Sequence, residues 1–153
     1  TLISGWSRYD RFLAGDQSAL STEEINGWQI FTGNAAKCAS CHSGPDLSDH
    51  SYQNIGLYLV YADEGRQRIS LQAGDAGKFK VPTLRNIALT APYMHDGSMA
   101  RLEDVVDHFA SGGEAHPNKS ALVTGFALSP QEKADLIAFL NALTDERSMD
   151  QIP

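Results

Sequence analysis

Cys38-Ala39-Ser40-Cys41-His42 has the spacing Cys-x-x-Cys-His and contains both cysteines of this chain of 153 residues. The spacing is typical of covalent haem c attachment, in which the two thiols bond to the vinyl groups of the haem. The histidine is then placed to ligate the iron through a ring nitrogen. A redox pair of cysteines would need a βαβ context, and a zinc site would need a second pair of ligands; the sequence offers neither. It therefore predicts one haem c.

The composition is that of a single acidic domain covering residues 1–153. Apolar residues make up 42% and the formal net charge at pH 7 is -7, so the chain has no electrostatic reason to bind nucleic acid or an anionic membrane. No apolar run reaches the length of a membrane span, and no signal peptide is visible. Because haem c is normally attached outside the cytoplasm, we expect the printed sequence to begin after a processing site or inside a longer protein.

Apolar residues at helical spacing predict a mainly α fold. The expected helices cover residues 1–14, 22–31, 99–111 and 130–143. The second and fourth begin with the Ser-x-x-Glu form of a capping box, led by Ser21 and Ser129. Residues 43–80 and 81–97 are mostly irregular, and loops of that length are usually functional or wrapped around something. We therefore expect a cytochrome c-like domain with long haem-wrapping loops.

The second axial position of the iron decides the chemistry of the site. A methionine there would raise the potential and make an electron carrier, whereas a tyrosine or an open position would let the iron react with peroxide or another small molecule. The candidates downstream are Met94, His95, Met99 and His108, while Met149 lies past the last predicted helix and too far out to reach. Each has a structural alternative, because methionines fill gaps in cores and histidines hydrogen-bond carboxylates or face solvent. Spacing alone does not choose among them.

Arg85 is a further candidate for contact with the haem. It lies in the apolar run Val81-Pro82-Thr83-Leu84-Arg85-Asn86, where an unpaired guanidinium would be costly. A haem propionate would be a natural bidentate partner. A salt bridge at the surface is the alternative, and the residues alone favour neither.

Three stretches carry a family resemblance: Leu13-Ala14-Gly15-Asp16, Phe79-Lys80-Val81-Pro82-Thr83-Leu84-Arg85-Asn86 and Leu89-Thr90-Ala91-Pro92-Tyr93-Met94-His95-Asp96-Gly97. Together they resemble the C-terminal haem domain of the bacterial dihaem cytochrome c peroxidases, in particular the branch with the methylamine-utilisation dihaem enzymes. The likeness runs from about Phe12 to Thr144. Members of the family have two cytochrome c-like domains, of which the first reacts with peroxide and the second takes in electrons. This chain resembles only the second.

The resemblance implies that the protein is bacterial and periplasmic and that a small periplasmic protein donates electrons to it. It also implies a second haem domain that is missing from this chain. Residues 1–14 would then be the remainder of an interdomain helix. It also implies calcium between the domains, held partly by the backbone carbonyls that match Thr90 and Pro92. The other donors would come from the missing half. Two carbonyls with water would hold calcium only weakly, because the ion prefers six to eight oxygens.

Phe109 departs from the family pattern. In the family the distal ligand follows the histidine of the Tyr-x-His-Asp-Gly run by fourteen residues, and it is methionine in the peroxidases and tyrosine in the methylamine branch. Counting from His95 reaches Phe109, whose phenyl ring cannot ligate iron. Either the haem is five-coordinate and Phe109 seals a dry pocket, or Met94, Met99 or His108 substitutes. We expect an open or weakly occupied site.

Three functions follow from this interpretation. The first is electron transfer, as the electron-entry half of a peroxidase-like oxidoreductase, in a chain that by itself lacks the peroxidatic haem. The second is direct reaction of an open iron with peroxide, for which no distal acid–base pair stands out, unless His95 or His108 points at the iron. The third is a free monohaem cytochrome or a sensor that binds a diatomic gas. The catalytic residues stay unidentified.

Overall fold

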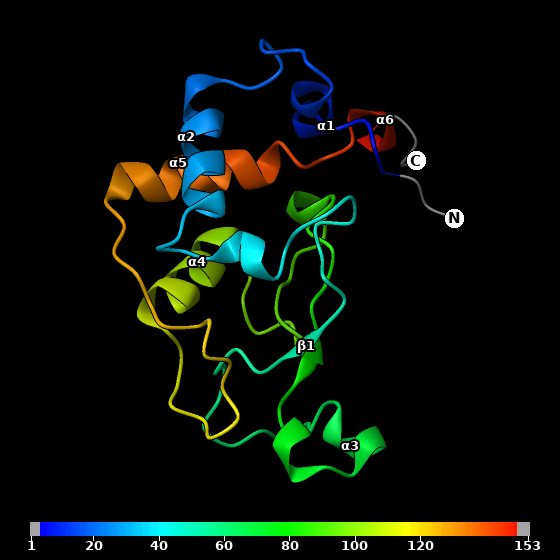
Figure 1. Cartoon of the computed structure of the whole chain (residues 1–153), viewed down its shortest axis with the longest axis vertical. Helices are drawn as coiled ribbons and strands as arrows, with labels where there is room; N and C mark the ends of the chain where they lie inside the picture. The colour runs from blue at the N-terminus through cyan, green and yellow to red at the C-terminus, as the bar shows by residue number, and fades with distance from the viewer. Residues whose placement is uncertain (1–3, 150–153) are drawn as a thin grey trace.

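The computed structural model of the chain describes residues 4–149 and is mainly helical, as predicted. The helices are α1 (Arg8–Leu13), α2 (Thr22–Thr32), α3 (Gln67–Ser70), α4 (Leu102–Ser111), α5 (Pro130–Asn141) and α6 (Glu146–Met149). The short elements among the loops are the 3-10 turns η1 (Cys38–Ser40), η2 (Ala73–Asp75) and η3 (Ile87–Leu89) and the strands β1 (Tyr52–Gln53) and β2 (Phe79–Lys80). In Figure 1, α2 and α5 cross at one end, α4 lies beneath them, and the loops with β1 and α3 extend to the opposite end.

The crossing of α2 and α5 depends on a glycine. A Cβ built on Gly27 would lie 2.0 Å from the carbonyl oxygen of Asp135, so the two backbones approach too closely for any side chain at this position. Phe31 and Phe139 meet beside this point with their ring centroids 5.2 Å apart. Phe139 is fully buried. The contact therefore joins an early and a late helix into one rigid unit.

Most predicted ends of the longer helices are confirmed, but α4 begins at Leu102 rather than at residue 99, because the backbone of Met99 pairs with Tyr93 instead. Ser21 and Ser129 cap α2 and α5, and each forms a complete capping box with the glutamate three residues later. Gly112 ends α4 with a left-handed φ of 84°. The apolar faces of these helices meet in a core. Its buried members are Phe31, Leu47, Tyr93, Leu102, Val106, Leu136, Phe139, Leu140 and Leu143.

The first helix is shorter than the sequence predicted. We expected residues 1–14 to be helical, but α1 begins only after Ser7, which forms a capping box of its own. The backbone N–H groups of Gly5 and Trp6 donate to the side-chain carboxylate of Asp145 at 3.1 and 3.2 Å. These two hydrogen bonds take the place of helical ones at Gly5 and Trp6. Because Asp145 is far away in the sequence, local spacing could not predict them. The first three residues of the expected helix lie outside the described part of the chain.

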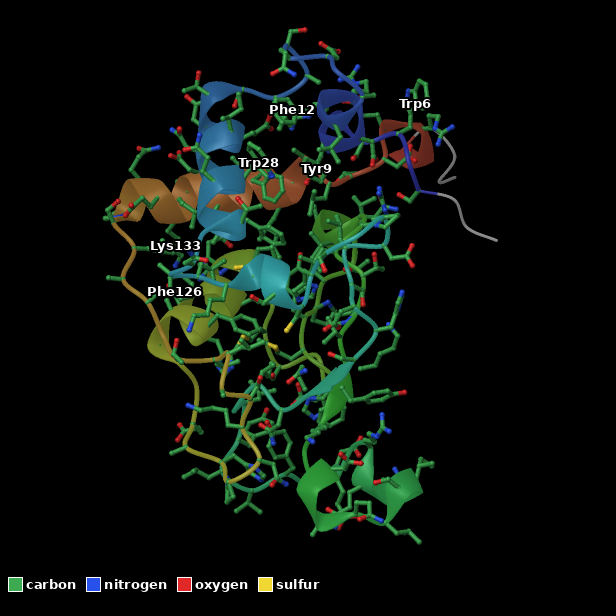
Figure 2. The ribbon with its side chains drawn as sticks, viewed as in Figure 1. Trp6, Tyr9, Phe12, Trp28, Phe126 and Lys133 are labelled. Atoms are coloured by element: carbon green, nitrogen blue, oxygen red, sulfur yellow. The ribbon has the colours of Figure 1, made fainter. Side chains whose placement is uncertain are left out.

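Aromatic side chains fix α1 against the crossing. Tyr9 meets Phe139 edge to face, with ring centroids 5.2 Å apart, and Phe12 meets Trp28 in the same way at 5.5 Å. Figure 2 shows Tyr9, Phe12 and Trp28 gathered where α1, α2 and α5 approach one another. Because α1 is held on the core in this way, its polar residues have defined positions.

The loops are more ordered than the sequence predicted. Residues 43–80 are mostly irregular, as expected, but β1 and β2 pair antiparallel, with Tyr52 opposite Lys80 and Gln53 opposite Phe79. Each strand has two residues, too few for an alternating pattern to show in the sequence. In the described part of the chain, no helix has the length and apolar character needed to cross a membrane.

A buried asparagine organises these loops. Asn54 has no exposed surface, and its carboxamide oxygen accepts from the backbone N–H of Gly56 at 2.8 Å and the hydroxyl of Tyr61 at 3.2 Å. Its amide nitrogen donates to the carbonyl of Ala76 at 3.2 Å and lies 3.1 Å from Nδ1 of His116. One side chain therefore links three segments that are far apart in the sequence.

Candidate haem site

The Cys-x-x-Cys-His run forms a tight turn just after α2. Lys37 enters the turn with a left-handed φ of 56°, and its backbone N–H donates to the carbonyl of Gly33, which ends α2. The N–H groups of Cys41 and His42 both donate to the carbonyl of Cys38, at 3.2 and 2.9 Å. The turn therefore brings two thiols and an imidazole together at the end of a helix that is fixed by the core.

The side chains of Cys38 and Cys41 are both half-buried. Burial raises the pKa of Cys38 to about 11, and burial also raises the pKa of Cys41. Cys38 packs at the edge of the apolar core, as do Leu84 and Met99. A buried thiol beside apolar side chains suits a bond to the vinyl edge of a porphyrin, whose ring needs an apolar setting.

A hydrogen bond fixes the orientation of the His42 ring. Its Nδ1 lies 3.1 Å from the carbonyl oxygen of Leu47. A carbonyl can only accept, so Nδ1 carries the proton, and in the neutral ring the lone pair lies on Nε2. Burial lowers the pKa of His42, which favours that neutral ring. Metal-ligating histidines commonly donate their other ring N–H to a carbonyl in this way. The residues present therefore fit a covalently bound haem c.

The segment after this turn is held by residues 81–85. The Nε of Arg85 donates to the carbonyl of Pro45 at 2.6 Å, and the hydroxyl of Thr83 donates to the carbonyl of Asp46 at 2.5 Å. Ser48 donates in the opposite direction, from its hydroxyl to the carbonyl of Val81 at 2.7 Å. The backbone next to Leu47 is thus fixed from both sides.

Arg85 forms an ion pair with Asp10 of α1. The Nη1 and Nη2 atoms lie 2.9 Å from the two carboxylate oxygens, and each side chain is 17% exposed. Burial raises the pKa of Asp10, but hydrogen bonds from Arg85 and Ser7 outweigh it, so the pKa lies below its ordinary value. Of the two partners expected for Arg85, the structure contains the carboxylate; a contact with a haem propionate stays a prediction.

A cleft of about 510 Å³ lies beside this ion pair. It is bounded by α1, the end of α2 and the loop from His42 to Leu47, with Leu13 and Phe31 among its apolar walls and Arg85 at its polar edge. The cleft leaves the haem turn close to the surface on the α1 side.

Two of the proposed distal ligands have other partners. The Nε2 of His108 lies 3.1 Å from the carbonyl of Ile55. The residue is half-buried, so it does not face solvent, which was one of its two alternatives. Met99 pairs through its backbone with Tyr93, and its side chain packs on the core. Met99 thus has the core-filling role that the sequence analysis gave as its alternative, whereas the contact of His108 with Ile55 was not foreseen.

Met94 and Phe109 are the other two residues that the sequence analysis connected with the distal position of the iron. Met94 is half-buried and has a left-handed φ of 70°, a conformation that is unusual for a residue with a Cβ. Phe109 is half-buried on α4, and its ring meets that of His108 at 5.4 Å. Met149 lies in α6, a short helix that the sequence did not predict.

His95 belongs to an aromatic cluster in the loops. Its ring stacks on that of Phe79, with centroids 3.8 Å apart, and lies 6.0 Å from Tyr61 and 6.4 Å from Tyr58. The hydroxyl of Tyr58 donates to Asp96 at 2.6 Å, and this bond is the largest cause that lowers the pKa of Asp96 to about 2. The sequence analysis did not identify Tyr58 or Tyr61 as partners of His95 and Asp96.

The cytochrome c family model matches residues 25–144. The chain belongs to the cytochrome c family. Membership implies a covalently bound haem c. The domain is 39% identical to the methylamine utilization protein MauG of Methylorubrum extorquens and 35% identical to the cytochrome c551 peroxidase of Nitrosomonas europaea. In both cases all of this chain is covered, but only 43% of the relative. The chain thus spans less than half the length of these homologues.

One solved structure resembles this domain in both sequence and fold. A MauG-like protein associated with microbial copper homeostasis is 40% identical, with a TM-score of 0.88 over 94% of this chain and 53% of that chain. The diheme peroxidase BthA of Burkholderia thailandensis has a TM-score of 0.75 over 97% of this chain and 48% of its own, at 20% identity. The second likeness shows the fold alone. The resemblance to dihaem peroxidases and MauG seen in the sequence is confirmed.

The two residues that the family resemblance assigned to calcium lie at the surface. Thr90 and Pro92 are exposed, and the hydroxyl of Thr90 donates to the carbonyl of Ile87 at 3.0 Å. Any calcium here would bind through backbone carbonyls. Among residues 4–149, no group of three or more His, Cys, Asp or Glu side chains is arranged to hold a metal ion.

Proposed function

We propose that this domain carries one haem c and transfers electrons between a small periplasmic donor protein and a second haem domain. Cys38 and Cys41 form the thioether bonds, and His42 is the proximal ligand. When bound, the haem supplies a one-electron redox couple. The observation that carries the proposal is the hydrogen bond from His42 Nδ1 to Leu47, which directs Nε2 toward the ligand role.

The domain's own residues keep the site rigid. Electron transfer needs little movement of the iron ligands between the two oxidation states, and the turn at Cys38 is fixed by the core, by α2 and by the loop that ends at Leu47. Cys38 and Ala39 pack against the apolar core, which excludes water from that side of the turn. The acidic chain, with a net charge of -7, favours donors with a basic surface.

On the distal side we propose that neither Met99 nor His108 ligates the iron. The contacts of Met99 with the core and of His108 with Ile55 support this assignment. Met94 or an open position next to Phe109 then remains. An open position favours the second candidate function, in which the iron reacts with peroxide or binds a small ligand, and the same openness would suit a monohaem gas sensor.

We also propose that calcium is at most a weak ligand of this chain. Thr90 and Pro92 offer two backbone carbonyls, and a calcium ion needs several more oxygen donors. A stable site would require a second domain that supplies them. In this proposal, the chain supplies only one side of a calcium site between two domains.

The test is to produce the chain with a haem c maturation system and measure its haem content and spectra. One haem per chain, retained after acid–acetone extraction, supports the attachment. Covalent haem should be lost in the double variant Cys38→Ala/Cys41→Ala and retained in an alanine variant of the exposed Ser40, which is the control. Haem that extracts freely from the unsubstituted chain would end the proposal.

The electron paramagnetic resonance spectrum of the ferric form separates the functions. A low-spin signal that becomes high-spin in Met94→Leu identifies that ligand and supports electron transfer. A high-spin signal in the unsubstituted chain shows the open position. Rapid oxidation of the ferric iron by peroxide would then favour the second function, whereas rapid reduction by a small basic cytochrome or copper protein without any peroxide reaction would favour the first.

A further inference from the structure

The loop that follows the haem turn presents three successive carbonyls to three different donors. The carbonyl of Pro45 accepts from Arg85, that of Asp46 accepts from Thr83, and that of Leu47 accepts from Nδ1 of His42. The first two bonds, at 2.6 and 2.5 Å, are shorter than the 3.1 Å of the third. The position of the Leu47 carbonyl is therefore set by a backbone that is fixed immediately before it.

We infer that Arg85 is a positioning residue for the proximal haem ligand, acting through Pro45 on the hydrogen bond between Leu47 and His42. The inference rests on the proposed function, because it takes His42 as the ligand of the iron. It differs from a contact of Arg85 with a haem propionate, since it needs no contact with the haem at all.

The guanidinium of Arg85 is itself fixed. Both terminal nitrogens of the guanidinium donate to the carboxylate of Asp10. The backbone N–H of Arg85 donates to the hydroxyl of Thr83 at 3.1 Å. Asp10 is held in turn by Ser7, whose hydroxyl lies 2.6 Å from the same carboxylate. A planar fork bonded on three of its nitrogens has little freedom. The rigidity of α1 is thereby passed to the loop.

The strength of the Nδ1 hydrogen bond matters for the iron. A carbonyl that accepts from Nδ1 makes the imidazole a stronger donor to the metal, and stronger donation favours the ferric state, which lowers the reduction potential. If Arg85 no longer held Pro45, the Leu47 carbonyl would move more freely and the bond would weaken. The potential should then rise.

Charge alone predicts a different pattern. Removing the positive charge of Arg85 would favour the ferric state and lower the potential, whereas removing the negative charge of Asp10 would raise it. Positioning predicts a rise in both cases. Arg85→Lys is the sharpest variant, because it keeps the charge but loses the fork.

The experiment measures the reduction potential of the haem-loaded chain by spectroelectrochemistry. For Arg85→Lys we expect the ferric-to-ferrous equilibrium to shift toward ferrous by about tenfold, which corresponds to about 59 mV upward for a one-electron couple. Arg85→Gln and Asp10→Asn should shift it in the same direction. Arg101→Lys is the control, because Arg101 pairs with Asp104 on the exposed side of α4 and should leave the potential unchanged.

A second readout reports on the hydrogen bond itself. In the cyanide-bound ferric form, proton exchange at His42 Nδ1 can be followed by NMR whatever the natural distal ligand is. We expect about tenfold faster exchange in Arg85→Lys, and no change in Arg101→Lys. Thr83→Val, which removes the neutral hydroxyl on Asp46, should act in the same direction and replaces Arg85→Lys if that variant fails to load haem.

An unchanged potential and an unchanged exchange rate in Arg85→Lys would overturn the inference, as would shifts of opposite sign in Arg85→Gln and Asp10→Asn. These results differ from a failure of the proposed function. If the unsubstituted chain attaches no haem, or if His42→Gly leaves the spectrum unchanged, then His42 is not the ligand and the proposed function fails at its first step.

Discussion

At the crossing of α2 and α5, two helices meet across a gap too small for a Cβ at Gly27, whereas around Asn54 three loop segments are joined through one carboxamide. The first region is stabilised by shape and apolar burial. The second is stabilised by buried hydrogen bonds, whose loss leaves unpaired polar groups. A haem domain needs both kinds, since the first fixes the attachment turn and the second orders the loops opposite the helices.

The crossing can be broken at its narrowest point. Gly27→Ala places a Cβ against the carbonyl of Asp135, and the helices must move apart to accept it. We expect the free energy of unfolding to fall by more than about 3 kcal/mol, measured by urea denaturation of the haem-loaded chain. Gly74→Ala is the matched control, because nothing lies within 4 Å of a Cβ there. Equal stability of the two variants would contradict the close contact.

The loop region can be broken at Asn54. In Asn54→Ala, the buried N–H of Gly56 and the hydroxyl of Tyr61 lose their acceptor, so we expect a loss of about 2 kcal/mol. Hydrogen exchange should show faster exchange at Gly56 and Leu57 than at the amides of α5. Asn141→Ala, at an exposed helix position, should change little. Uniform loss of protection over the whole domain would mean that the two regions are not separate in their stability.

The ion pair between Asp10 and Arg85, which holds α1 against the loop beside the haem turn, can be tested by pH. Hydrogen bonds from Arg85 and Ser7 outweigh burial and hold the pKa of Asp10 below its ordinary value, so its stabilisation is fully present above the unfolded value and is lost as the pH falls through the folded one. We expect Asp10→Asn to cost about 1 kcal/mol at pH 7 and progressively less below about pH 4. Urea denaturation at several pH values measures this, and a difference that grows on acidification would contradict the assigned direction.

The smallest expected effect is that of calcium. Addition of millimolar calcium or of a chelator should leave the melting temperature and the haem spectrum of this chain unchanged, because two carbonyls at Thr90 and Pro92 are too few donors. Isothermal titration calorimetry provides the direct measurement. Binding at micromolar concentration would show that the loop is a more complete site than its exposed position indicates.

The sequence predicted the helical region well because its signals are local. Capping boxes at Ser21 and Ser129, the glycine after α4 and the Cys-x-x-Cys-His run each lie within a few residues of the structure they determine. The family resemblance added the relation to MauG and the peroxidases, which the comparisons confirmed. The close approach at Gly27 gave no such signal, because its partner lies on α5.

The loops and the surroundings of the haem turn were less predictable for the same physical reason. The partners of Arg85 and His108 lie 75 and 53 residues away in the sequence, and no periodic pattern marks such pairs. His108 was expected to face solvent or ligate iron, and its bond to Ile55 was not foreseen. The shorter α1 is a third case, since its boundary depends on Asp145.

That contact of Asp145 with Gly5 and Trp6 has a consequence for how the domain can be connected. The backbone near the start and the backbone near the end of the described chain are joined by side-chain hydrogen bonds of 3.1 and 3.2 Å, and α1 and α6 lie next to each other in Figure 1. The two ends of the described chain therefore lie on the same side of the domain. Such a domain can be circularly permuted through a short linker or inserted into a host protein. The loops at the opposite end of the molecule would stay exposed in either case.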